Sequence, residues 1–180
     1  MYYDLFILGS IMEEPHYGYE IKKKLAEGFS ACSAISNNTL YPILKKFQDL
    51  GATQKTVETV EGKPSRIIYH ITDKGRQLFV DELRHFPDRL LHNRDDFFMR
   101  LVYFHYLDRD TRVRALDGRQ TFLEQGMSHI KTRDGGKPSS DTAEFHINLL
   151  QSECALIEKF RARLDEPCII TADGVLLKTP

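Results

Sequence analysis

Four polar side chains, Asn37, Asn38, Thr39 and Tyr41, lie close together in a short stretch of the 180-residue chain. Side-chain amides and hydroxyls can hydrogen-bond to the edges of bases, and a phenol can donate to a phosphate oxygen. Lys45 follows them, and an ammonium group beside such a cluster can neutralise phosphate charge. This combination of residue types is typical of a surface that binds nucleic acid.

The polar cluster comes at the start of a predicted helix. Behind it, apolar residues recur at helical spacing and are expected only to pack in the core: Leu40, Ile43, Leu44, Phe47 and Leu50. Proline is tolerated in the first turn of a helix, where backbone donors have no partner. Because of Pro42, we therefore expect the helix to begin near Asn38 or Thr39 and to end at Gly51.

The chain on either side of this helix supplies the elements that would position the cluster. Residues 3–12 form an apolar stretch that ends before Pro15, and residues 19–29 have the pattern of an amphipathic helix. Two β-prone runs, residues 53–60 and 66–71, flank a loop with glycine and proline, which predicts a hairpin. Thr72 and Asp73 then begin another helix.

Three helices followed by a hairpin is the order of a winged helix-turn-helix, in which the third helix enters the major groove of DNA. The residues expected to contact DNA are Tyr19, Lys22, Lys23, Asn37, Asn38, Thr39, Tyr41, Lys45, Lys63, Ser65 and Arg66. Lys24 and Lys46 extend the same basic edge. Two other interpretations remain open, because Tyr41 could be a core residue and a run of lysines is often only a solvated face.

The string SNNTLYPILKKFQDLG resembles the recognition-helix signature of the PadR-family transcriptional regulators, whose commoner form reads Ser-Pro-Gly-Thr-Leu-Tyr-Pro. The strings HYGYEI and KPSRIIYHITDKG resemble the same family's second helix and wing. Further along, RDDFFMRLVYF resembles the start of the longer C-terminal helical domain that the family shares with virulence activators of the alpha type. The resemblance extends over about residues 3–164.

The sequence departs from the family pattern at two informative places. Asn37 and Asn38 replace the usual Pro-Gly, so we expect different bases to be preferred. Ala52 and Thr53 stand where an apolar pair is usual, so we expect the wing to pack differently. The tail, residues 166–180, has no counterpart and no assigned role.

The resemblance implies a homodimer on a near-palindromic operator in double-stranded DNA, usually repressing a neighbouring gene until a small effector releases it. Aromatic carboxylates such as phenolic acids are the effectors that it suggests. The implied fold is mainly α with a small β-hairpin, divided into a DNA-binding domain (residues 1–86) and a helical dimerisation and effector domain (residues 87–165). Activation instead of repression stays open, because the sign depends on where the operator lies.

The C-terminal half is helical in pattern throughout. A capping box at Asp141 starts a helix that runs to Asp165, and its apolar face is broad enough to need a partner helix. We expect that face to mediate dimerisation through Ile147, Leu150, Cys154, Ile157 and Leu164. An aromatic segment upstream is either core and dimer interface or the lining of an effector pocket, for which the candidates are Phe97, Arg100, Tyr103, Phe104 and His105.

Composition excludes several classes of protein. The three cysteines and seven histidines show no metal-ligand or disulfide spacing, no catalytic or phosphate-loop motif occurs, and no segment reads as a signal peptide or membrane span. We therefore expect a cytoplasmic protein without metal, cofactor or enzyme activity. The formal net charge of −1 leaves one alternative open, a winged-helix module that docks a protein instead of DNA.

Overall fold

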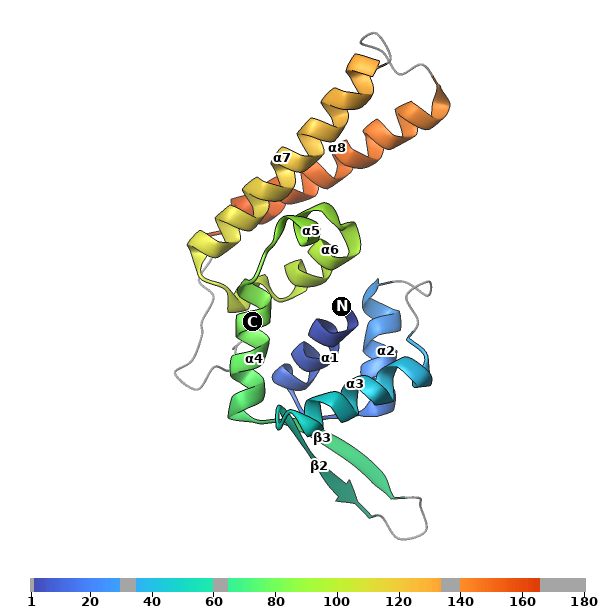
Figure 1. The fold of residues 1–180 in the computed structure, drawn as a ribbon, viewed down its shortest axis with the longest axis vertical. Coiled ribbons are helices and arrows are strands. Elements are labelled where there is room, and N and C mark those ends of the chain that lie inside the picture. Colours follow the sequence, from blue (N-terminus) through green and yellow to red (C-terminus); the bar gives the residue numbers. More distant parts are fainter. Residues whose placement is uncertain (1, 30–34, 60–64, 134–139, 166–180) are drawn as a thin grey trace. The chain divides into compact units, whose positions relative to one another are not determined.

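The computed structural model describes residues 2–29, 35–59, 65–133 and 140–165. These residues form two compact units, one ending at His85 and one beginning at Phe86 (Figure 1). The described part is mainly α-helical with a small antiparallel sheet, which confirms the predicted fold class. Lys63 and the tail, residues 166–180, lie outside the described residues.

The first unit is built around α1 (Tyr2–Glu13). Every residue from Leu5 to Met12 is buried, and a helix that is apolar all round must be covered on all sides. Its neighbours are α2 (Gly18–Phe29), α3 (Asn37–Asp49), α4 (Asp73–Arg84) and the strand β3 (Arg66–Ile71). The apolar stretch read in the sequence is thus the central helix of this unit.

The wing is the hairpin of β2 (Thr53–Glu58) and β3, in register from Thr53 opposite Ile71 to Glu58 opposite Arg66. A third strand, β1 (His16–Tyr17), pairs with β3 on its other edge, so the strand order is β1-β3-β2. The sequence did not predict β1, because two residues are too short to show an alternating pattern. Its effect is to bring Tyr17 to the wing.

The helix α3 begins slightly earlier than predicted, at Asn37, after the cap residue Ser36. Pro42 therefore lies beyond the first turn. Because proline has no backbone N–H, the carbonyl of Asn38 lacks the hydrogen bond that residue 42 would otherwise donate to it. The Ser36 carbonyl accepts from the backbone N–H groups of Thr39 and Leu40, at 3.1 and 2.9 Å. These bonds fix the first turn, so the predicted polar cluster lies on the helix from its first residue.

A tight junction joins the end of α3, the start of β2 and the start of α4. Gly51 has a φ of 69°, which glycine adopts without strain, and Ala52 behind it is fully buried. The hydroxyl of Thr72 donates to the carbonyl of Gly51 at 2.7 Å and accepts from the backbone N–H of Gly75 at 3.1 Å. Thr72 is thus the predicted cap of α4.

The second unit contains α5 (Asp88–His92), α6 (Arg94–Val102), the short helix η2 (Phe104–Tyr106), α7 (Arg109–Arg133) and α8 (Asp141–Ala162). The long helices α7 and α8 pack side by side (Figure 1). The cap of α8 is Ser140, whose hydroxyl accepts from the backbone N–H of Ala143, and not the predicted Asp141. The helix ends at Ala162, three residues before the predicted Asp165.

A buried ion pair joins the helices of the second unit. Arg119 on α7 and Glu153 on α8 are 3% and 5% exposed and lie 2.6 Å apart. The same guanidinium donates to the carbonyl of Leu91 and lies over the rings of Phe97 and Phe122, 5.5 and 5.4 Å from their centroids. The network therefore holds α5 and α6 against the α7–α8 pair.

We expect Gly75→Ala to destabilise the first unit, because an added Cβ would lie 2.0 Å from the carbonyl oxygen of Ala52. The backbone must shift to relieve that contact, at a cost of about 2 kcal/mol in the free energy of unfolding. Gly126→Ala in α7 is the control, since its Cβ would meet nothing closer than Leu150 at 3.6 Å. Urea denaturation measures both, and equal stability of the two variants would contradict the prediction.

Glu153→Gln should lower the free energy of unfolding of the second unit by about 3 kcal/mol, because it leaves the charge of Arg119 buried without its counter-ion. Asp117→Asn removes the exposed ion pair with Arg161 on the same two helices and should cost at most about 1 kcal/mol. Thermal unfolding of the two variants compares them. A similar loss of stability in both variants would show that the buried ion pair contributes no more than the exposed one.

Candidate nucleic-acid interface

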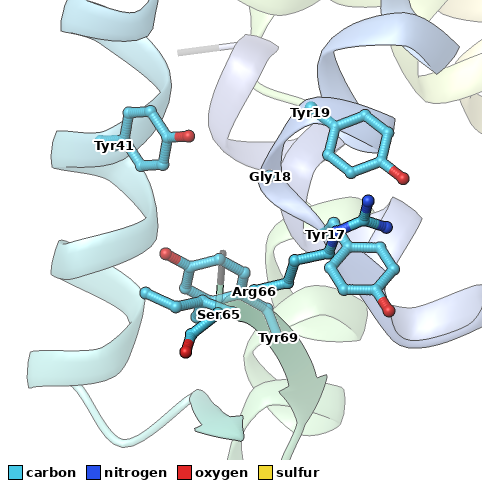
Figure 2. A pocket seen from close by; sticks show the side chains of 8 residues that line it. Tyr17, Gly18, Tyr19, Tyr41, Ser65, Arg66 and Tyr69 are labelled. Carbon is cyan, nitrogen blue, oxygen red and sulfur yellow. The ribbon is translucent and has the colours of Figure 1, made fainter. Parts of the chain in front are cut away.

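A hollow of about 410 Å³ lies on the first unit where β1, α2, α3 and the wing meet (Figure 2). Its lining residues are Tyr17, Gly18, Tyr19, Tyr41, Ser65, Arg66, Ile67 and Tyr69. Four of the predicted contact residues, Tyr19, Tyr41, Ser65 and Arg66, are brought together here from three different elements. The hollow thus combines several phenolic hydroxyls with one guanidinium group.

One side of the hollow is held by contacts around Tyr17. Its ring stacks on that of Tyr19 with 5.5 Å between centroids, and the Arg66 guanidinium lies 5.8 Å from the Tyr17 centroid. The Tyr17 hydroxyl donates to the carboxylate of Glu58, and this hydrogen bond raises the pKa of Tyr17 above its usual value. Sequence reasoning missed Tyr17, although the strand β1 that positions it follows directly from Pro15.

The other side of the hollow is formed by Tyr41, which points from α3 toward the side that carries Tyr19 and Arg66 (Figure 2). A Cβ at Gly18 would lie 3.3 Å from the Tyr41 ring, so glycine allows this close approach. Tyr41 is 48% exposed and Tyr19 is 55% exposed, so Tyr41 is not a core residue. Tyr69, which also lines the hollow, is buried, and burial raises its pKa.

Most lysines of the predicted basic edge have carboxylate partners. The pairs are Lys23–Glu27 at 3.8 Å, Lys24–Glu14 at 3.2 Å, Lys45–Asp49 at 3.1 Å and Lys46–Asp4 at 3.3 Å. The Lys24 ammonium also lowers the pKa of Glu14, because it donates a hydrogen bond to the Glu14 carboxylate. Such exposed pairs are weak, so these lysines remain able to exchange a carboxylate for a phosphate.

The first turn of α3 is polar and accessible. The Lys22 ammonium donates to the side-chain oxygen of Asn37 at 3.3 Å, and the hydroxyls of Thr39 and Ser36 lie 3.0 Å apart. Asn38 is exposed, and its side-chain amide makes no hydrogen bond within the described residues. Among the described residues, no carboxylate forms an ion pair with Lys22 or Arg66. These two side chains therefore differ from the paired lysines.

The predicted effector residues fall into two groups in the second unit. Phe97, Arg100, Tyr103 and Phe104 are buried, and His105 is half-buried. A hollow of about 350 Å³ lies nearby, lined by Leu101, Val102, Phe104, His105, Arg112, Phe160, Arg163 and Leu164. Only Phe104 and His105 of the predicted set line it. Arg163 and Arg112 are additions that the sequence did not suggest.

The predicted dimerisation residues lie on the α8 side of the α7–α8 pair or just after it. Ile147, Ile157 and Leu164 are buried within the single chain, and Leu150 and Cys154 are half-buried. The helix α7 of the same chain therefore covers much of the face for which the sequence required a partner. Phe145, at 63% exposed, is the large apolar side chain of α8 that stays accessible.

Two kinds of feature are absent from the described residues. No group of histidine, cysteine, aspartate and glutamate side chains there could hold a metal ion. None of the described helices is both long and apolar enough to cross a membrane.

A family model described as the transcriptional regulator PadR-like family matches residues 7–81. The match begins within α1, ends within α4 and includes both α3 and the wing. Residues 7–81 are therefore similar to the PadR-like family. This PadR-like domain contains the whole hollow around Tyr17 and Tyr41, and the resemblance seen in the sequence is confirmed for it. Its family is one of transcriptional regulators and not of enzymes, as we expected.

Several solved structures are similar to the chain. A transcriptional regulator from Clostridium thermocellum is 26% identical over 44% of this chain and 76% of its own, with a TM-score of 0.41. A PadR-family transcriptional regulator from Eggerthella lenta is 28% identical over 44% and 66%, with a TM-score of 0.39. Bacillus subtilis PadR, solved in complex with operator DNA, is 20% identical over 90% and 98%, with a TM-score of 0.41. Among curated proteins, none matches the sequence.

Proposed function

We propose that the protein binds operator DNA through α3 and the wing of its PadR-like domain and represses transcription in the cytoplasm. The observation that carries this proposal is the hollow beside α3 that is lined by Tyr19, Tyr41 and Arg66 together. Hydroxyl and guanidinium groups are donors for phosphate oxygens. The hollow would receive the DNA backbone while α3 lies in the major groove.

The individual side chains divide into two roles. Asn37, Asn38 and Thr39 lie at the leading end of α3, from which recognition helices reach base edges. The phosphate contacts come from the hollow and from the lysines beside α3, namely Tyr19, Tyr41, Ser65, Arg66, Lys22, Lys23 and Lys45. Because four lysines are already paired with carboxylates, we expect weak non-specific binding and a strong dependence on the right site.

A homodimer would present two copies of α3 to a near-palindromic operator, about 34 Å apart along the duplex. On α8, exposed Phe145 and half-buried Leu149 and Leu156 form an apolar stripe beside the residues that pack on α7. We expect this stripe, together with half-buried Leu150 and Cys154, to contact the second copy. Ile147, Ile157 and Leu164 would support that contact from within the chain.

The effector is expected in the hollow of the second unit. Phe104, Phe160 and Leu164 give it an apolar wall, and His105 and Arg163 bring groups that can carry positive charge. Apolar sites with a few convergent polar groups are typical of small-molecule binding. An aromatic carboxylate fits this chemistry, with its ring on the phenylalanines and its carboxylate beside Arg163.

A second candidate function is favoured by one observation on the wing. Val57 and Ile67 are cross-strand partners and are 60% and 41% exposed. An exposed apolar pair on the wing would also suit a protein partner. In addition, the pairing of lysines with carboxylates reduces the attraction to DNA. A complex with a protein that survives nuclease treatment, without any selected DNA site, would favour this function.

Tyr41→Ala and Arg66→Ala should each weaken binding to a duplex selected by the wild-type protein about tenfold, because each removes a phosphate contact. Arg89→Ala, an exposed arginine of the second unit, is the matched control and should leave the affinity unchanged. Titration of labelled duplex at fixed salt measures the affinity, and light scattering confirms that the oligomer is intact. Wild-type affinity in both hollow variants would contradict the proposed interface.

Benzoic and cinnamic acids should raise the apparent Tm of the protein, and their neutral amides should not, because only the acids carry the charge that Arg163 attracts. Arg163→Ala should abolish the shift, whereas Arg89→Ala should keep it. Thermal-shift assays over the ligand series make the comparison. An equal response to acids and amides, or no response to any acid, would contradict the proposed effector class.

A further inference from the structure

One hydrogen bond links the second helix to the first residue of the recognition helix. The Nζ of Lys22 on α2 lies 3.3 Å from the Oδ1 of Asn37 on α3. An ammonium group has donors and no acceptor, so its partner on Asn37 must be the amide oxygen and not the amide nitrogen. This bond turns the Asn37 amide oxygen toward Lys22 and leaves its NH₂ group to face a ligand.

Lys22 differs from the two lysines that follow it. Lys23 pairs with Glu27 at 3.8 Å, and Lys24 pairs with Glu14 at 3.2 Å. Among the described residues no carboxylate lies within ion-pair distance of Lys22, which is half-buried against α3. Its donor thus serves Asn37, and its positive charge stays uncompensated at the leading end of the helix.

The hydrogen bond from Lys22 affects which base Asn37 can recognise. A free asparagine amide recognises adenine by donating to N7 and accepting from N6. The Lys22 ammonium occupies one of the two acceptor positions of the Asn37 oxygen and places a positive charge beside it, so donors dominate this end of α3. Guanine presents two acceptors, N7 and O6, in the major groove, whereas adenine and cytosine both present an amino group there.

We propose that Lys22 is a specificity-determining residue that switches Asn37 from adenine to guanine. The inference rests on the proposed function, because it requires α3 to read DNA. Asn38 provides an internal contrast. Its amide makes no hydrogen bond within the described part of the chain, so it keeps both a donor and an acceptor and suits adenine. Two adjacent asparagines would then read different bases.

Selection from random duplexes tests this with four proteins: wild type, Asn37→Ala, Lys22→Met and Lys23→Met. Loss of base preference in Asn37→Ala identifies the position that Asn37 governs in each half-site. The wild type should select guanine there. Lys22→Met frees the amide oxygen and should change the preference to adenine by about tenfold. Lys23→Met removes the same charge from the next residue and should keep guanine.

The outcomes separate the two proposals. If the wild type selects no sequence at all, operator binding is contradicted and the inference fails with it. If the wild type selects a site but Lys22→Met keeps guanine at the position of Asn37, operator binding stands and the role of Lys22 is overturned. Selection of adenine by the wild type at that position, or a switch to adenine in Lys23→Met, would overturn that role as well.

Discussion

The need to cover α1 on all sides determines the geometry of the first unit. Because every residue from Leu5 to Met12 is buried, α2, α3, α4 and β3 must all pack around this one helix. The junction of Gly51, Ala52 and Gly75 then sets where the wing leaves α3. The proposed interface itself contains exposed phenols and charged groups, which contribute little to stability. Its shape is therefore a consequence of the core beneath it.

Charge placement matters more than net charge in this protein. Residues 1–76 carry ten basic and nine acidic side chains, yet the acidic groups are not distributed evenly among the basic ones. Four lysines beside α3 have carboxylate partners, whereas Lys22 and Arg66 interact with Asn37 and with the Tyr17 ring. A surface of this kind attracts phosphate weakly at long range and depends on close contacts. Such a surface favours recognition of a particular site over general attraction to DNA.

Local patterns in the sequence were sufficient for the main elements and for the polar end of α3. Alternating β-prone residues predicted the wing, and apolar spacing at Leu40, Leu44 and Phe47 predicted the recognition helix. Contacts between distant residues were not predictable in the same way. The strand β1 is visible only once Tyr17 pairs with Ile68, and Lys46 meets its partner Asp4 across the fold. Likewise, α7 of the same chain covers much of the α8 face that the sequence assigned to a second copy, because helix pairing cannot be read from one helix.

The central claim is that the leading end of α3 and the tyrosine-lined hollow meet DNA. Side-chain amide signals in a nuclear magnetic resonance spectrum, titrated with a selected duplex, test it most directly. The account predicts that the signals of Asn37 and Asn38 shift or broaden as duplex is added, while that of Gln125, exposed on α7, does not. Unchanged signals from both asparagines at saturating duplex, or changes confined to Gln125, would contradict it.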